Sequence, residues 1–499
     1  MEPSAQATPR QDTLFRLTAL LLIVAPLFRA GNRPLPLMLL EFCALAILLL
    51  VLWSPRRERR MSPGIRLSLL ALFLLPLLYL VPLPEFLWQA LPGRGIYSDL
   101  LTGAGWRPAS LVPMNTETAW LALLPPIAMF VATMQFDTTA LKSLVHLLFA
   151  VAALQATLGL IQFGAGPDSV FYFGLPMGGN ATGTYPNRNH LAGLLEMAFP
   201  ISLALTVASV GQSGSKSGRR SRWRQRLDFL STGRGHQAFA YGALTLLFLL
   251  AIIFTRSRTG IALSMLGIFI SIFAFSRRLG GDNIYGTVGT VIAASIGLAA
   301  IIGLAPVLDR FSAIDTVEDS RIRIFSSSID GIGEFFPFGS GPGSYPETYP
   351  RFEPPALAGG RLVNHAHNDY IEWIFEGGLL AGAIVAVFLV IYLRQWSHVW
   401  TRGAWGTFKF IQAGAGIGIL LMLLHGLTDF NQRIPANMIY LAFLAALFLS
   451  PEKDKVKIKQ KKHRHHRHHA HHTQRPAREE TPVTPRPPAP GDVRNPFMD

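Results

Sequence analysis

Residues 363–378 read VNHAHNDYIEWIFEGG and close a polar segment that begins near residue 306, between two strongly apolar stretches. An apolar helix is expected to start directly after this polar segment. Ionisable side chains at the mouth of a membrane helix are costly to keep there, which makes them candidates for function. The candidates in this stretch are His365, His367, Asn368, Asp369 and Glu372.

The composition of the chain predicts an all-α polytopic membrane protein. Half of the 499 residues are hydrophobic and 15% are charged, and the mean hydropathy is +0.33. The apolar residues occur in blocks long enough to cross a bilayer, which excludes a soluble domain. We predict about twelve transmembrane helices, at 14–27, 35–53, 65–83, 118–135, 141–163, 189–210, 238–255, 259–276, 284–307, 377–393, 408–428 and 434–450.

Positive charge predicts the orientation of these helices. The net charge of +15 lies in short loops and in the tail rather than on one nucleic-acid-binding face, so a nucleic-acid partner is excluded. With twelve helices, every basic cluster falls on one side, which we assign to the cytoplasm together with both termini. These clusters are at 56–60, 219–226 and 277–278 and in the tail. The single cysteine, Cys43, excludes an intramolecular disulfide.

Four parts follow from this layout. They are a cytoplasmic N-terminal segment (1–13), a first group of transmembrane helices (14–140), a second group (141–450), and a basic tail (451–499). The second group contains a long outside loop over 308–375, before the tenth helix. The tail is rich in Lys, His and Pro, and its composition predicts disorder. A solvated tail at anionic lipid, a metal-buffering histidine run and an assembly partner are three hypotheses for it.

A first candidate anion site lies before the sixth helix, where residues 183–193 read GTYPNRNHLAG. Arg188 is expected at the outside end of that helix. It is flanked by Asn187, Asn189 and His190. An arginine that snorkels to lipid headgroups is the alternative interpretation.

A second candidate anion site is the turn FTRSRTG, residues 254–260, which holds Arg256 and Arg258 close together. Two like charges repel unless an anion lies beside them, and guanidinium groups match phosphate oxygens in bidentate geometry. Together with Arg188 they would hold a diphosphate, although binding to lipid headgroups explains them as well. In the long outside loop, 321–332 has the spacing of an amphipathic helix, followed by a turn at 337–343. Its Arg321 and Arg323 would help to bind the same anion or would face solvent.

Three interpretations compete for the HAHNDYIEW stretch. His365 and His367 could bind a metal, but further ligands with suitable spacing are missing. Asn368 or Asp369 could cap the next helix. His367 could act as a general base, oriented by Asp369 or by Glu372.

Two other groups of ionisable residues carry less weight. Glu196 falls within an apolar run, where pairing with a buried partner is expected rather than catalysis. Between the last two helices, His425, Asp429 and Arg433 are expected at the outside face and could line the same cavity.

Five motifs, in this order, resemble the O-antigen ligase and polysaccharide polymerase superfamily of bacterial inner-membrane proteins. They are GTYPNRNHLAG (183–193), SRTG (257–260), RIRIFSSSIDGI with FPFGSGPGSYPETY (321–349), HAHNDYIEWIFEGGLLAG (365–382) and DFNQRIPAN (429–437). The resemblance spans about residues 140–450. Arg256 beside Arg258, His365 beside His367, and the His-rich tail depart from the family pattern.

The resemblance implies a GT-C-like transferase that works without a metal or other cofactor at the periplasmic face. Its donor would be a glycan linked to undecaprenyl diphosphate, and its acceptor a lipid A–core sugar or another glycan. The catalytic residues of the family correspond to His367, Arg258 and Arg188. In this scheme an acceptor hydroxyl attacks the anomeric carbon, His367 takes its proton and the arginines stabilise the departing diphosphate, so that the configuration inverts.

Alternatives remain at this point. The motifs do not separate an O-antigen ligase from an exopolysaccharide or O-antigen polymerase or from a protein O-glycosylating transferase. A transporter of lipid-linked glycans would need its cationic residues along a path across the bilayer, whereas here they gather on one face. The sugars, the acceptor and the oligomeric state are not indicated by the sequence.

Overall fold

The computed structural model describes residues 9–53, 61–100, 105–174, 178–211, 231–279, 316–355, 362–401 and 405–451, together with a few isolated positions. The tail from Glu452 onward forms a separate unit and lies outside the described residues, so the predictions for it stay predictions. The predicted helix at 284–307 and the basic clusters at 56–60 and 219–226 also lie outside them.

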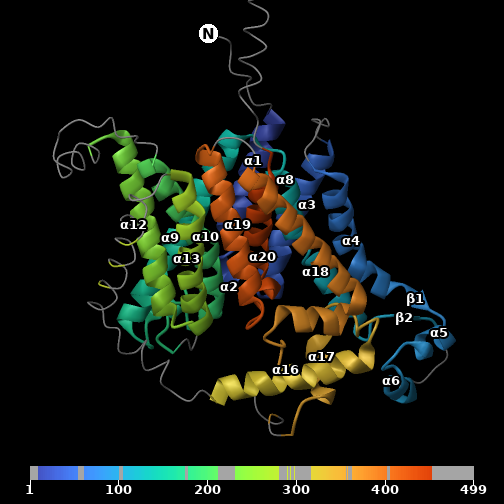
Figure 1. The fold of residues 1–499 in the computed structure, drawn as a ribbon. Helices are drawn as coiled ribbons and strands as arrows, with labels where there is room; N and C mark the ends of the chain where they lie inside the picture. The colour runs from blue at the N-terminus through green and yellow to red at the C-terminus, as the bar shows by residue number, and fades with distance from the viewer. Residues whose placement is uncertain are drawn as a thin grey trace, which may run out of the picture. The chain divides into compact units, whose positions relative to one another are not determined.

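The described part of the chain is helical, with only two short strands. The N-terminal helices are α1 (Pro9–Val24), α2 (Leu27–Ala30), α3 (Pro34–Trp53), α4 (Pro63–Leu80), α7 (Pro113–Leu121), α8 (Leu124–Thr133) and α9 (Thr138–Ala165). Later in the chain follow α10 (Arg188–Gly211), α12 (Gly233–Thr255), α13 (Arg258–Leu279), α18 (Asp369–Thr401), α19 (Thr407–His425) and α20 (Pro435–Leu449) (Figure 1).

Nine helices among the described residues are long and apolar enough to cross a membrane, with α7 and α8 counted as one, and α20 is a shorter apolar helix. The prediction of an α-helical membrane protein is thus confirmed. Eleven of the twelve predicted ranges overlap a helix, and the twelfth is 284–307, so the count of twelve stays a prediction.

Helix α10 lies at the centre of the bundle, and its whole apolar stretch is buried. It packs against α9, α12, α13, α19 and α20. Glycines on α19 allow the close approach, because a Cβ at Gly414 would lie 2.8 Å from the carbonyl oxygen of Pro200 and one at Gly418 2.8 Å from that of Met197. Such backbone contact holds the start of α10 and the end of α19 in fixed positions, and both carry candidate site residues.

A smaller polar layer covers one end of the bundle. It contains β1 (Pro82–Leu83) and β2 (Arg107–Pro108), which pair antiparallel, and α5 (Glu85–Ala90) and α6 (Gly95–Leu100). Helix α16 (Thr316–Phe335) runs across the ends of the spanning helices, beside α17 (Tyr345–Thr348) and η2 (Tyr349–Arg351) (Figure 1).

This layer has its own core, which is built from aromatic rings. Phe335 packs edge-on against Phe375 at 5.3 Å, and Tyr345 stacks on Tyr349 at 5.0 Å. Buried Arg94 ties the layer together, since its Nη2 donates to the carbonyl oxygens of Ala109 at 2.7 Å and Gly339 at 3.1 Å. The predicted amphipathic helix at 321–332 and the turn at 337–343 are both confirmed.

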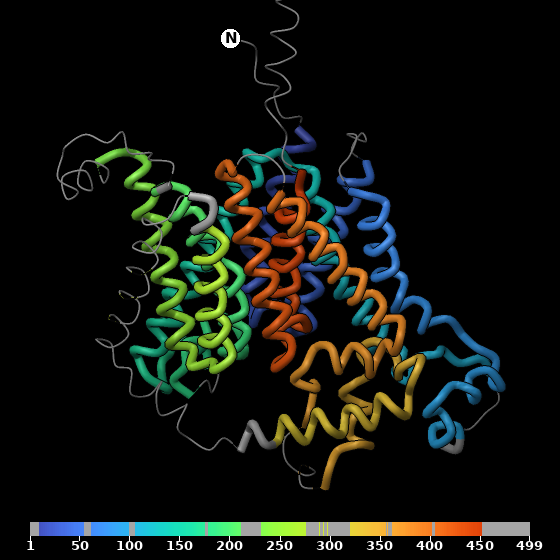
Figure 2. Tube along the Cα trace, viewed as in Figure 1, coloured from blue at the N-terminus to red at the C-terminus, as the bar shows by residue number. Residues whose placement is uncertain are grey.

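Helix α18 differs from the prediction at both ends. The transmembrane helix was predicted over 377–393, but α18 begins at Asp369, where Asn368 caps it as one of the three interpretations of this stretch proposed. Helix α18 also continues to Thr401 instead of ending at 393. At Gly378 the backbone leaves the helical conformation (φ 54°, ψ −145°), so that a short polar piece and a long apolar piece meet at an angle (Figure 2).

Candidate functional site

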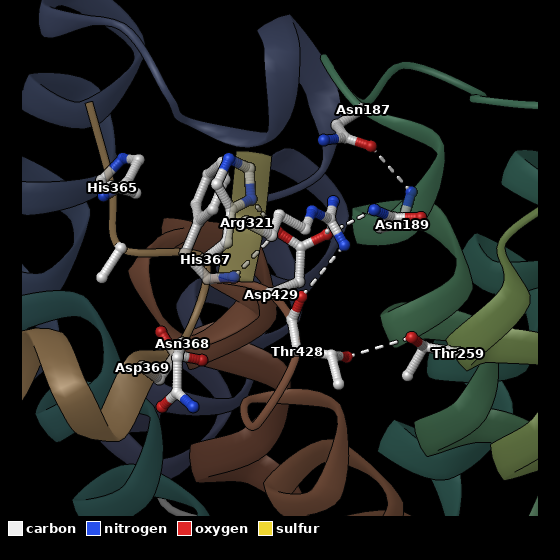
Figure 3. A network of polar contacts seen from close by, with 12 residues as sticks. Asn187, Asn189, Thr259, Arg321, His365, His367, Asn368, Asp369, Thr428 and Asp429 are labelled. Atoms are coloured by element: carbon white, nitrogen blue, oxygen red, sulfur yellow. Dashed lines mark hydrogen bonds and ion pairs between the residues drawn. The ribbon is translucent and has the colours of Figure 1, made fainter. Parts of the chain in front are cut away.

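Five segments that are far apart in the sequence meet at the end of the bundle that the polar layer covers. They are the starts of α10 and α13, helix α16, the loop before α18, and the turn between α19 and α20. Figure 3 shows their polar side chains converging on that turn.

Asp429, in the turn between α19 and α20, is the hub of the network. Its carboxylate is 1% exposed. Oδ1 accepts from His367 Nδ1 at 3.2 Å and from its neighbour's backbone N–H at 2.9 Å. Oδ2 accepts from Asn189 Nδ2 and lies 3.7 Å from Arg321 Nη2. Arg321 also donates from Nη1 to the carbonyl oxygen of Thr428 at 3.1 Å. Three of the predicted site residues are thus brought together by an aspartate that was only weakly indicated.

Asp429 is ionised in this environment. Burial alone would raise the pKa of its carboxyl group, but the hydrogen bond from His367 and the nearby positive charge of Arg321 outweigh burial and hold the pKa well below its usual value. An ionised carboxylate only accepts hydrogen bonds, so the proton of the His367 pair lies on Nδ1. In the neutral imidazole, the Nε2 atom of His367 then carries the lone pair that can accept a proton.

The backbone of His367 is in the left-handed region, with φ 51°. A non-glycine residue rarely adopts this conformation, which costs roughly 1–3 kcal/mol and persists only where the surroundings enforce it. Here the hydrogen bond to Asp429 and the capped helix that begins two residues later enforce it. Such strained residues cluster at functional sites, which supports the special role predicted for His367.

His365 belongs to a second cluster and does not contact Asp429 (Figure 3). Its Nδ1 lies 3.0 Å from Glu372 Oε1. Arg433 Nε is 3.3 Å from the same oxygen, and Arg433 Nη2 is 2.8 Å from Glu376 Oε2. The ring of Phe430 separates the two clusters, since His365 stacks on it at 4.1 Å and His367 meets its edge at 5.1 Å.

The structure corrects the prediction of what orients His367. Neither Asp369 nor Glu372 contacts it: Asp369 Oδ2 accepts from the backbone N–H of Gln432 at 3.0 Å, and Glu372 pairs with His365. The capping interpretation of Asn368 is confirmed, because its Oδ1 accepts from the backbone N–H groups of Tyr370 at 3.0 Å and of the next residue at 3.1 Å. Asn368 and Asp369 therefore fasten α18 to the turn that holds Asp429.

The predicted arginines lie at the same end of two touching helices. Arg188 begins α10 and donates from Nη1 to Asn180 Oδ1 at 3.2 Å, and Arg258 begins α13. The first turns of these helices are adjacent, because a Cβ at Gly260 would lie 2.9 Å from the Cβ of Ala192. The positive ends of both helix dipoles add to the charge of the arginines there.

Arg256 and Arg323 differ from this pair. Arg256 is the C-cap residue of α12 and has φ 58°. Its backbone N–H donates to the carbonyl oxygen of Ile253 at 3.0 Å. Arg323 is exposed on α16. Thr259, in the first turn of α13, forms a hydrogen bond between its Oγ1 and Thr428 Oγ1 at 3.0 Å, which joins the α13 start to the Asp429 turn (Figure 3).

The remaining predicted residues support the framework. Asn187 Oδ1 accepts from the backbone N–H of Asn189 at 2.9 Å at the start of α10. His190 is 1% exposed and meets the edge of Phe430 at 4.9 Å, so in this structure it packs rather than faces an open site. The expected buried partner of Glu196 is His425, at 3.0 Å.

Among the described residues, no group of three or more His, Cys, Asp and Glu side chains is arranged to hold a metal ion. His365 and His367 each pair with a different carboxylate, on opposite sides of Phe430.

Comparison with known protein families decides the relationship of the chain. Residues 243–386 match the family model described as O-antigen ligase. This match supports the O-antigen ligase superfamily as the family that the chain resembles. None of the curated proteins compared with it matches the chain. The family match and the nine candidate spans together indicate an O-antigen ligase-type membrane protein.

The O-antigen ligase match covers the α12–α13 turn, α16 and the HAHND stretch, but it includes neither Arg188 nor Asp429. Asp429 was missed as a central residue because its contacts come from segments that precede it by 62 to 240 positions. The signal that could have found it is the polar run DFNQR between two apolar helices. The packing of Phe430 against both His365 and His367, and the pairing of Glu372 with His365, were likewise not predicted.

Proposed function

We propose that this protein transfers a glycan from a lipid diphosphate, undecaprenyl diphosphate, to an acceptor hydroxyl at the periplasmic face of the bacterial inner membrane, with both termini in the cytoplasm. The observation that carries the proposal is the buried Asp429 carboxylate that joins His367, Asn189 and Arg321. It unites the proposed base and the cationic group of Arg321 within one network.

The proposed base is His367. A general base needs an orienting partner and an atom directed at the proton that it takes. Asp429 is the orienting partner, because it fixes the tautomer of His367. The Nε2 atom of His367 is the one that takes the proton. The acceptor oxygen forms its bond to the anomeric carbon of the donor glycan while Nε2 of His367 takes the hydroxyl proton. The bond from that carbon to the diphosphate oxygen breaks, and the single displacement inverts the configuration.

The proposed site for the leaving diphosphate lies at the starts of α10 and α13. Negative charge grows on the diphosphate as its bond to carbon breaks, and fixed cations stabilise that charge most effectively where water is excluded. Arg188 and Arg258 are half-buried there, and Arg321 is held near them by Asp429 and Thr428. These cations supply the charge that a divalent metal would otherwise provide, so we propose a metal-independent reaction.

Glycan transfer by the purified full-length protein tests this proposal. The donor is an oligosaccharide on undecaprenyl diphosphate, and the variant is His367→Asn. Asparagine tolerates positive φ, so it removes the imidazole while it keeps the backbone conformation. Loss of a general base lowers turnover by roughly 10²–10⁴-fold.

The matched control is His398→Asn, which removes an exposed histidine far along α18. It should leave turnover unchanged. Wild-type-like turnover in His367→Asn would contradict the role of the imidazole. Movement of labelled lipid-linked glycan across vesicles by a wild-type protein that consumes no donor would favour a transporter instead.

A further inference from the structure

A narrow apolar groove lies on the side of the bundle opposite to the arginines. Its volume is about 200 Å³, and its walls come from α4, α8, α18, α19 and α20. None of its lining residues belongs to α10, α12 or α13, which carry or adjoin Arg188 and Arg258. Figure 1 shows α12 and α13 on one flank of α19 and α20, and α4, α8 and α18 on the other.

The groove is long in the direction of the membrane normal. Along α20 its lining runs from Met438 to Leu449, which corresponds to ~16 Å at 1.5 Å per residue. It is thus shaped like a channel parallel to the spanning helices, as a lipid chain in one leaflet would need. Its volume is below the roughly 300–1,000 Å³ of pockets that enclose a drug-sized molecule. A groove of this volume accommodates a segment of one hydrocarbon chain.

A second cavity, lined by both polar and apolar residues, adjoins the groove. This cavity has a volume of about 380 Å³ and shares Pro126, Trp373, Gln432 and Met438 with the groove. The shared residues place the two spaces side by side, and His365 and Arg433 line the cavity but not the groove.

The chemistry of the cavity fits a saccharide. It is lined by polar side chains of several types, Asn115, Thr118, His365, Gln432 and Arg433. The indole of Trp373 forms one wall, and the guanidinium of Arg433 lies 5.8 Å from the centre of that ring. A few placed polar groups around an aromatic face are the usual makeup of a site for a small polar ligand. Arg433 is paired with Glu372 at 3.3 Å and with Glu376 at 2.8 Å, so a saccharide would meet this ion-pair cluster rather than an unpaired cation.

The cavity reaches the cluster of His365, which Phe430 separates from the cluster of the proposed base. His365 lines it and is two residues from His367, and both rings pack on Phe430. A saccharide in the cavity would present its end at the boundary between the two histidine–carboxylate pairs. The arginines on the opposite flank remain available for the donor.

We propose that the cavity binds the acceptor saccharide and that the apolar groove binds the single polyprenyl chain to which this acceptor is attached. The inference rests on the proposed transferase function and makes it more specific: the second substrate is a lipid-linked glycan with one hydrocarbon chain, not a lipid with several acyl chains and not a protein. Such an acceptor is the one that a polymerizing reaction uses.

The test fills the groove and compares two acceptors. Ala445→Phe places a ring in the groove, which Ala445 lines. The matched control is Ala386→Phe, at an exposed position of α18 that does not line it. Each purified full-length variant receives the same polyprenyl-diphosphate donor. The acceptor is either the same saccharide on a polyprenyl diphosphate or that saccharide without lipid. Thermal unfolding establishes that both variants fold.

The proposal predicts an increase of at least tenfold in KM for the lipid-linked acceptor in Ala445→Phe, since each displaced methylene contributes roughly fourfold to binding. Transfer to the lipid-free saccharide stays unchanged, and Ala386→Phe changes neither reaction. A polyprenyl-linked acceptor that carries a benzophenone on its chain should also crosslink to residues of α20 in the wild-type protein.

Two results would overturn the inference. If Ala445→Phe slows transfer to both acceptors equally, the groove holds the donor chain. If wild-type protein uses a multi-acyl glycolipid acceptor and Ala445→Phe is as active with it as wild type, the groove has no role in the acceptor. Absence of donor consumption by wild type with every acceptor would instead refute the proposed function itself.

Discussion

Replacement of Asp429 by asparagine removes one charge and almost no volume, so it tests whether this carboxylate positions His367. The carboxylate accepts hydrogen bonds from His367 Nδ1 at 3.2 Å and from Asn189 Nδ2, and it lies 3.7 Å from Arg321. Hydrogen bonds to a charged group contribute roughly 1.5–3 kcal/mol each. In Asp429→Asn, the new side-chain NH₂ group takes the place of one carboxylate oxygen. It then faces a hydrogen-bond donor, either Asn189 Nδ2 or His367 Nδ1, and that hydrogen bond is lost.

We expect Asp429→Asn to lower the free energy of unfolding by about 2–4 kcal/mol, the loss of one to two charged hydrogen bonds. We also expect turnover to fall by roughly 10²–10⁴-fold, because the imidazole loses the partner that fixes its tautomer. Initial rates of glycan transfer and thermal unfolding in detergent measure the two effects.

The double variant Asp429→Asn/Asn189→Asp separates these effects. It exchanges donor and acceptor, so the hydrogen bond between positions 189 and 429 is restored while the charge moves away from His367. Stability should recover and turnover should not. Turnover of Asp429→Asn within threefold of wild type, or turnover that recovers together with stability in the double variant, would refute the positioning role.

The remaining predictions concern pH, a buried cation and two backbone positions. Since the pKa of Asp429 is lower in the folded than in the unfolded protein, its ionised form stabilises above about pH 4, and this contribution is lost on acidification. The unfolding temperature should thus fall more between about pH 5 and pH 3 in wild type than in Asp429→Asn; equal slopes would contradict the shift. Arg433→Gln should cost about 3–5 kcal/mol of stability, because two buried carboxylates lose their partner, whereas exposed Arg323→Gln should change it by less than about 0.5 kcal/mol. Gly378→Ala should prevent stable folding, since a Cβ there would overlap a carbonyl oxygen, and Gly382→Ala, with open space around it, should be tolerated; similar unfolding temperatures would show that the break in α18 is not required. Arg256→Gly should be more stable than Arg256→Ala by roughly 1 kcal/mol in free energy of unfolding, because φ at this position is 58°. Its unfolding temperature should therefore be higher, and the reverse order would show that this conformation is not maintained.

The membrane fold could be predicted from the sequence because hydropathy and helix caps act locally. The apolar runs located the helices, and the turn at 256–258 lies between α12 and α13 as expected. The start of α18 was only one of three interpretations of the HAHND stretch, because a single side chain, Asn368, moves the boundary into polar sequence. The layer formed by α5, α6, β1 and β2 was also missed, since its stability depends on contacts such as those of Arg94 with Gly339, 245 positions away.

The site could be predicted only in part for the same reason. His367, Asn189 and Arg321 were identified from their motifs, and they do meet. Their common partner was not identified, because a carboxylate beside the histidine in sequence seemed the simplest orienting group. Asp369 instead accepts a backbone N–H of the Asp429 turn, and Glu372 holds His365. Which carboxylate reaches which histidine depends on how α18 and α19 pack, and that is not encoded in local spacing.

The central claim is that the arginines bind the donor diphosphate and that His367 acts only in the transfer step. The most direct measurement is donor affinity and single-turnover rate side by side, for wild type, His367→Asn and Arg258→Gln. The account predicts that His367→Asn binds the lipid diphosphate donor with a Kd within threefold of wild type but transfers at least a hundredfold more slowly. Arg258→Gln should bind it at least tenfold more weakly. Equal weakening of donor binding in both variants, or normal binding in Arg258→Gln, would contradict this division of roles.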